Sequence, residues 1–145
     1  MAHISGSIRI AAPQELVFDT VADSRVEPSF NPAMSQVELL TLEPIGVGTT
    51  FRARMARAGM DMLIEVVEFD RPRGLRSRTT SSVMQTTGSL TCTRVDGGTL
   101  LAWDWQVRPR GWYRLMSPLV GLFGHRMERR IWTGLKHKLE ATPLA

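Results

Sequence analysis

The chain has 145 residues, of which 43% are hydrophobic and 22% are charged, and its formal net charge is +4. These proportions are those of an ordinary globular domain, so they exclude a disordered or fibrous chain. A chain of this length can bury a hydrophobic core without disulfides or a structural metal. We therefore expect one domain over residues 1–145.

The cysteine content and the hydropathy pattern indicate the compartment. Cys92 is the only cysteine, so neither an intramolecular disulfide nor a CxxC redox pair can form. The N-terminal sequence lacks a basic segment followed by a long apolar stretch, and no run approaches the roughly 20 apolar residues that cross a membrane. We expect a soluble, cytoplasmic protein without a membrane span, present as a monomer or a homodimer.

The positive charge is concentrated near the C-terminus. Residues 108–140 contain eight Lys or Arg residues against two acidic ones, Glu128 and Glu140. Such a segment can attract nucleic acid or an anionic membrane, and salt-sensitive binding would reveal that function. Since one face of the segment must be buried, we instead expect a solvated helix face and no nucleic-acid partner.

The first part of the chain predicts one strand and two short helices. Residues 3–10 alternate between apolar and polar side chains, which is the period-2 pattern of a half-buried strand. Residues 13–22 begin with proline and continue with spaced apolar residues, a pattern typical of a short helix. Pro28 and Pro32 then bracket a second brief helix and a turn that presents Phe30 inward.

Five or six strand candidates follow, separated by turns rich in glycine, proline and aspartate. Such short connections force neighbouring strands to be antiparallel, because a parallel return needs a crossover of a dozen or more residues. The candidates are about 34–42, 49–57, 60–69, 74–80, 84–94 and 99–107. Together with the first strand they predict an antiparallel sheet of about seven strands.

The last segment has helical spacing. Apolar side chains recur at every fourth residue from Leu115 to Leu139, and Ser117-Pro118 is a typical helix start. A helix from Pro118 to Leu139 is about 30 Å long, enough to lie across a small sheet. With so few helices only one sheet face can be covered, so we predict an α+β fold whose curved sheet closes on this helix around a hydrophobic pocket.

Strand alternation and the helical stripe together predict which side chains line this pocket. Most of them are aromatic residues or methionines, and methionine suits a surface that accepts several ligand shapes. A hydroxyl on the inward face would orient a ligand. The predicted lining is Phe30, Phe51, Met55, Met62, Ser77, Met84, Trp103, Trp105, Phe123 and Met127. Because such stripes also form ordinary cores, a plain hydrophobic core is the alternative.

Several short motifs, spread over nearly the whole chain, resemble those of a known superfamily. They are Phe30-Asn31-Pro32, Gly46-Val47-Gly48-Thr49, Asp70-Arg71-Pro72-Arg73-Gly74-Leu75, Gly97-Gly98-Thr99 before the Trp103/Trp105 strand, and Leu135-Lys136-His137-Lys138-Leu139-Glu140. In this order they resemble the START-like (SRPBCC) helix-grip superfamily, nearest its polyketide cyclase/dehydrase and lipid-transport branch. The resemblance implies a sheet wrapped on a long C-terminal helix and an internal ligand cavity. Where many relatives carry Trp in the second short helix, this chain has Phe30.

Catalytic residues cannot be assigned from the sequence. The three histidines lie towards the two chain ends, no nucleophile elbow is present, and no ligand cluster has metal-binding spacing, so we predict neither a metal nor a cofactor. His125 could serve as a general acid or base, although its helical position favours exposure to solvent. Arg54 or Arg78 could polarise a carbonyl only if the strand alternation were shifted by one residue.

Two functional hypotheses remain. The first is carriage or sensing of a hydrophobic small molecule, such as a lipid or a polyketide-like compound, in the internal cavity. The alternative is a polyketide cyclase/dehydrase-type enzyme that acts on a ligand in the same cavity. Turnover of a linear polyketide that is lost when His125 or an inward Arg is replaced would separate the second hypothesis from the first.

Overall fold

The computed structural model describes residues 2–56, 60–111 and 117–141, the side chains of residues 117–122 excepted. Its helices and strands lie where the sequence predicts them, with ends that differ by a few residues. In chain order they are β1 (Ala2–Ile10), α1 (Gln14–Ala22), the 3-10 helix η1 (Ser24–Ser29), β2 (Met34–Leu39), β3 (Thr50–Met55), β4 (Asp61–Asp70), β5 (Gly74–Thr80), β6 (Met84–Val95), β7 (Gly98–Pro109) and α2 (Ser117–Ala141).

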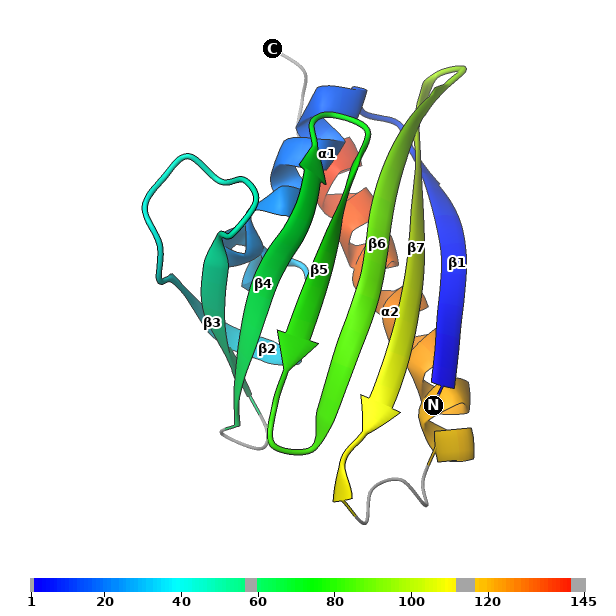
Figure 1. Cartoon of the computed structure of the whole chain (residues 1–145). Coiled ribbons are helices and arrows are strands. Elements are labelled where there is room, and N and C mark those ends of the chain that lie inside the picture. The colour runs from blue at the N-terminus through cyan, green and yellow to red at the C-terminus, as the bar shows by residue number, and fades with distance from the viewer. Residues whose placement is uncertain (1, 57–59, 112–116, 142–145) are drawn as a thin grey trace.

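The seven strands form one antiparallel sheet with the order β1-β7-β6-β5-β4-β3-β2. Strands β2 to β7 make a meander, and β1 pairs with β7 from Ala2 opposite Val107 to Ile10 opposite Thr99. The sheet curves, α2 crosses one of its sides, and α1 lies near one end of the sheet, close to the end of α2 (Figure 1). This arrangement confirms the predicted α+β helix-grip architecture.

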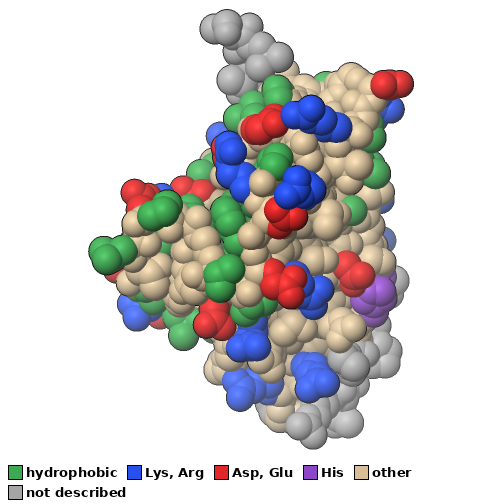
Figure 2. Space-filling model, turned by 45° about the horizontal axis from the view of Figure 1, so that its top comes forward, with side chains coloured by type: hydrophobic (Ala, Val, Ile, Leu, Met, Phe, Trp, Pro, Cys, Tyr) green, Lys and Arg blue, Asp and Glu red, His purple; other side chains and the backbone are tan. Residues whose placement is uncertain are grey.

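The outer face of the sheet carries charged side chains in cross-strand pairs. The pairs are Arg52 with Glu38, Arg54 with Asp61, and Arg78 with Glu65, at N–O distances of 3.7, 3.9 and 3.3 Å. Acidic and basic side chains lie next to one another on the side of the molecule seen in Figure 2. Exposed ion pairs stabilise a fold by at most about 1 kcal/mol each. Their positions show that Arg54 and Arg78 point to solvent, as the alternation predicts.

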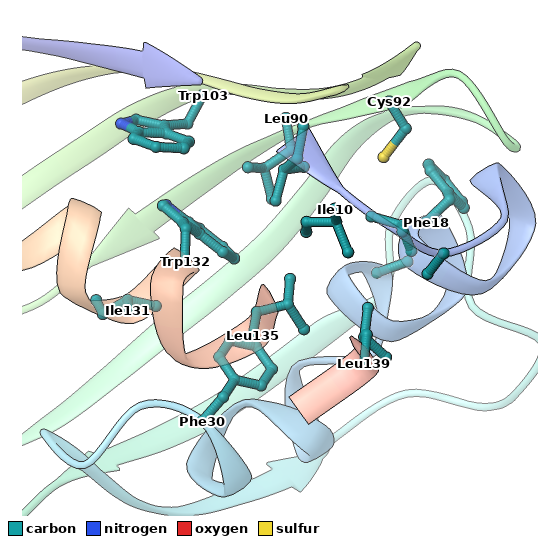
Figure 3. Close-up of a cluster of buried hydrophobic side chains, with 14 of the residues drawn as sticks. Ile10, Phe18, Phe30, Leu90, Cys92, Trp103, Ile131, Trp132, Leu135 and Leu139 are labelled. Atoms are coloured by element: carbon teal, nitrogen blue, oxygen red, sulfur yellow. The ribbon is translucent and has the colours of Figure 1, made fainter. Parts of the chain in front are cut away.

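The hydrophobic core lies between the other sheet face and the C-terminal half of α2. Trp132 of α2 packs against Trp103 of β7 and Phe30, with ring centroids 6.0 and 6.1 Å apart, and Leu135 is fully buried (Figure 3). Gly6 of β1 lies against the Trp103 indole so closely that a Cβ at that position would overlap the ring. The aromatic cluster therefore depends on a glycine in the adjacent strand.

The end of α2 is tied to the end of β1. The Lys136 ammonium donates to the carbonyl oxygen of Arg9 at 2.7 Å, and the Glu140 carboxylate accepts from the Ala11 N–H at 2.8 Å. Lys136 and Glu140 also pair with each other at 2.6 Å. No helix in the described part of the chain has both the length and the apolar character that a membrane crossing requires.

The central packing of α2 can be tested by truncating one side chain. Leu135→Ala should lower the free energy of unfolding by about 2–5 kcal/mol, because it removes fully packed carbon atoms and leaves a void. The matched control is Leu42→Ala, whose side chain is 91% exposed, and a change below about 0.5 kcal/mol is expected there. Urea unfolding followed by tryptophan fluorescence measures the free energy of unfolding of both variants. Similar losses of stability in the two variants would contradict this packing.

Candidate ligand site with two buried carboxyl groups

Side chains of the sheet and the helices enclose a cavity of about 120 Å³ beside the aromatic core. A water molecule takes about 30 Å³ of liquid volume, so this space suits a small polar group better than a whole lipid. Its walls come from α1, η1, strands β4 to β7 and α2. The lining residues are Val21, Ala22, Ser24, Glu27, Ile64, Val66, Leu75, Ser77, Thr79, Leu90, Trp105, Glu128, Ile131 and Trp132.

A glycine in β6 keeps one part of the inward sheet face free of side chains. Gly88 pairs with Ser77 of β5 on one side and with Trp105 of β7 on the other. Directly opposed residues share a face, so Gly88 belongs to the inward face next to two residues of the cavity wall. A Cβ there would overlap the carbonyl oxygen of Asp104, which explains why only glycine fits.

Glu128 of α2 is held in this cavity by two tryptophans. Its Oε2 accepts hydrogen bonds from the indole N–H of Trp132 at 2.7 Å and from that of Trp105 at 3.2 Å. Burial raises the pKa of Glu128 from its ordinary value of 4.5 to about 7; the two indole bonds lower it and the nearby Glu27 raises it further. A group that titrates near neutral pH can donate or accept a proton under physiological conditions.

Glu27 of η1 is the second carboxyl group on the cavity wall. Its Oε2 accepts a hydrogen bond from the Asn31 side-chain N–H at 2.9 Å, and the side-chain Oδ1 of Asn31 accepts from the Ala33 N–H at 3.1 Å. Burial raises the pKa of Glu27, while the Asn31 bond acts in the opposite direction. The cavity thus contains two acids with weakened acidity, contributed by two different elements.

Several oxygens on the cavity wall are available to a ligand. Within the described part of the chain, the protein donates hydrogen bonds to Oε2 of Glu27 and Glu128 but not to Oε1 of either residue. The hydroxyls of Ser24 and Ser77, both more than nine-tenths buried, likewise have no partner among the described residues. No fully enclosed side-chain oxygen in the described part of the chain lacks a partner, so these oxygens keep some accessible surface, and their residues line the cavity.

A wider groove of about 670 Å³ lies next to the cavity. Ile131 lines both spaces, and Asn31 of the groove bonds Glu27 of the cavity. Most of the groove is apolar, with two arginines among its lining residues. They are Asn31, Pro32, Ala33, Met55, Met60, Phe123, Arg126, Met127, Arg130 and Ile131.

The predicted site residues fall into three groups. Two of them, Ser77 and Trp105, line the cavity, and three more, Met55, Phe123 and Met127, line the groove. The other five lie elsewhere on the inner side of the fold. Phe30, Phe51 and Trp103 are buried in the core, Met62 is half-buried on β4, and Met84 packs against the cluster of Ala2, Ile4 and Val107.

Phe123 and Met127 lie on an exposed side of α2 rather than opposite Trp103 and Trp105. Their side chains are 59% and 51% exposed. At 3.6 residues per turn, positions four apart drift by about 40° at each step, so a stripe of every fourth residue winds around the helix. By Phe123 the stripe has turned about 80° away from Ile131, which lies on the buried face.

Neither glutamate was found by sequence reasoning. For Glu128 a signal exists, because on a helical projection it lies about 60° from Ile131, between the buried Leu135 and Leu139. An acidic residue in the middle of a buried helix face is a candidate for function. Glu27 gives no comparable signal, because a 3-10 helix of six residues has too little periodicity to define a face.

The solvent side of α2 carries a basic groove. It is open to solvent and is lined by His125, Arg126, Arg129, Arg130, Thr133, Gly134 and His137. His125 is exposed, as its helical position predicts, and it does not line the cavity. In the described ranges no group of three His, Cys, Asp or Glu side chains is placed to hold a metal ion.

The burial of Glu128 should appear in the pH dependence of stability. Its pKa is about 7 in the folded chain and near 4.5 in the unfolded chain, so the folded state binds more protons between these values and stability falls as the pH rises. Glu128→Gln keeps an oxygen acceptor for the indoles but cannot ionise. Relative to this variant, the wild type should lose roughly 3 kcal/mol of its free energy of unfolding between pH 4.5 and pH 8. Urea unfolding at both pH values measures the loss, and a constant difference would contradict the burial.

Comparisons with known proteins agree with this fold. The family model described as polyketide cyclase/dehydrase and lipid transport matches residues 1–140. No curated protein matches the chain.

Solved structures give the same result. A START superfamily protein from Mycobacterium smegmatis has a TM-score of 0.83 and 16% identity, with 97% of this chain and 99% of that one covered. A protein from Thermus thermophilus has a TM-score of 0.80 and 18% identity, and the match covers 96% of this chain and 97% of that one. The Zhui aromatase/cyclase from a Streptomyces species has a TM-score of 0.78 and 17% identity, and the match covers 95% of this chain and 93% of that one. The chain therefore belongs to the polyketide cyclase/dehydrase and lipid-transport family and has the START-like helix-grip fold.

Proposed function

We propose that the protein binds a hydrophobic small molecule whose polar end enters the cavity and whose apolar part lies in the adjacent groove. The observation that supports this most is the pair of half-buried carboxyl groups with raised pKa values, Glu27 and Glu128, on the wall of an otherwise largely apolar cavity. Burying two acids costs stability, and apolar side chains would fill the same space more favourably. Strongly shifted carboxyl groups in a cavity are typical of functional sites.

The two spaces divide the ligand into a head and a body. Pockets for small molecules usually have volumes of about 300–1,000 Å³, so the cavity of 120 Å³ is too small for a whole lipid or polyketide. The groove of 670 Å³ is large enough for an apolar body and presents methionines, which adapt to different shapes. Ile131, which lines both spaces, marks where the head and the body would join.

Filling the cavity should weaken ligand binding without unfolding the protein. 1-Octanol, used as a neutral probe, should change the tryptophan emission, since the Trp105 indole lines the cavity, and should raise the melting temperature. Ser77→Leu places three extra carbon atoms there and should weaken binding at least about tenfold. Ser7→Leu, on an exposed position of β1, is the matched control and should bind as the wild type does. Equal affinity in both variants, or no response in the wild type, would refute the proposal.

A second candidate function is general acid–base catalysis in the same cavity, and the pKa of Glu128 near 7 favours it. In a dehydration, Glu128 as carboxylate would remove a proton from the carbon next to a carbonyl group. The electron pair of the broken C–H bond would form the carbon–carbon double bond. The β-hydroxyl group would leave as water with the proton of Glu27. A proton passed from Glu128 to Glu27 would then restore both groups.

Turnover of a β-hydroxy ketone to the unsaturated ketone would test this second function. Glu128→Gln should reduce kcat at least about a hundredfold, because an amide cannot exchange the proton. His125→Ala and Arg78→Ala should leave kcat unchanged, since both side chains point to solvent. Turnover measured by liquid chromatography would argue against catalysis by Glu128 if the Gln variant matched the wild type.

A further inference from the structure

We propose that the polar end of the ligand is an amine, which binds as an ammonium group between Glu27 and Glu128. This inference rests on the proposed function, because it names the chemistry of the ligand for the same cavity. It is carried by the kind of polar groups that face the cavity and by the atoms that the protein leaves without a partner.

Apart from the two indoles, every polar side chain of the cavity wall can accept a hydrogen bond. Besides the two carboxyl groups they are the hydroxyls of Ser24, Ser77 and Thr79. The two indole N–H donors of the wall, Trp105 and Trp132, are already bonded to Glu128, and none of the lining residues is Lys, Arg or His. An ammonium group has three N–H donors and no acceptor, so it complements this wall.

Each carboxyl group has one oxygen fixed by the protein and one left for a ligand. Oε2 of Glu128 is held by two indoles and Oε2 of Glu27 by Asn31, which orients both groups. The two Oε1 atoms and the Ser77 hydroxyl have no protein partner in the described ranges, and their three residues line the cavity. Three acceptors around one small space match the three donors of an alkylammonium.

The charges also favour a cation. A carboxylate withdrawn from water without a counter-charge is costly, so burial raises the pKa of both carboxyl groups, that of Glu128 to about 7. A protonated amine supplies the missing positive charge and lets a carboxyl group ionise. The binding of an amine should therefore release a proton and become tighter as the pH rises through about 7.

Few titratable groups set the pH dependence of amine binding. Among the residues that line the cavity, η1 contributes Glu27, α2 contributes Glu128, and α1 and the strands contribute only uncharged side chains. The nearest basic residues that line the groove are Arg126 and Arg130, which are exposed and therefore screened by solvent. A neutral alcohol, which can accept a hydrogen bond from a protonated carboxyl group, should instead bind equally well or better at low pH.

The test compares octylamine with 1-octanol by isothermal titration calorimetry on the full chain at pH 6 and pH 8. At pH 8 we expect octylamine to bind at least about tenfold more tightly than 1-octanol, and to lose about tenfold in affinity at pH 6. Titrations at pH 6.5 in buffers of different ionisation enthalpy should show close to one proton released for each amine bound. Glu128→Gln should remove the preference for the amine, whereas Glu68→Gln, on an exposed position of β4, should keep it.

The outcomes separate this inference from the function on which it rests. If 1-octanol binds and octylamine binds no more tightly at pH 8, the amine is refuted while a hydrophobic ligand site remains. If neither compound binds, both proposals are refuted. A preference for octylamine that persists in Glu128→Gln and Glu27→Gln, or that releases no proton in the wild type, would place the ammonium group elsewhere and overturn the inference.

Discussion

The packing of Trp132 and Leu135 of α2 against the inner face of the sheet determines where the rest of the molecule lies. Trp132 contacts Trp103 and Phe30, so it joins the sheet, the long helix and the segment after η1. A single helix cannot cover the whole inner face of a curved sheet of seven strands. The cavity is the space that remains beside this contact, where α1 and η1 complete the wall.

The same contact links the stability of the fold to the chemistry of the site. Trp132 packs its ring in the core and donates its N–H to Glu128 at 2.7 Å, so one side chain serves both purposes. Substituting Trp132 would disturb the core and leave Glu128 with a weaker set of donors. The second donor, Trp105, belongs to β7, and thus the carboxyl group is positioned by the sheet and the helix together. Such support from rigid elements is what a preorganised binding site requires.

Much of the fold could be predicted from the sequence, because local signals decide it. Alternation and turn residues gave the strands, and Ser117-Pro118 gave the start of the long helix. Inward Ser77 and outward Arg78 followed from the same alternation. The helix face was predicted less well, because apolar spacing of four residues drifts around the helix and included the exposed Phe123.

The carboxyl groups escaped prediction for a different reason. Acidic residues are rarely buried, so composition counts Glu27 and Glu128 as surface charge. Whether a carboxyl group faces water or a cavity depends on how distant segments pack, and η1 meets α2 only in the folded chain. The helical projection could have identified Glu128, since it falls among Ile131, Leu135 and Leu139. The orientation of the Glu27 side chain could be known only from the structure.

The central claim is that the half-buried Glu128 holds its carboxyl group in a ligand cavity, and the titration of that group tests this most directly. Carbon-13 NMR of the glutamate carboxyl groups, with the Glu128 signal assigned by its absence in Glu128→Gln, gives the pKa of that one residue. The structure predicts a midpoint of about 7 for Glu128, while Glu15 and Glu140, whose pKa values are lowered by hydrogen bonds and basic partners, titrate below 4.5. A midpoint near 4.5 for Glu128 would contradict both its burial and the site built around it.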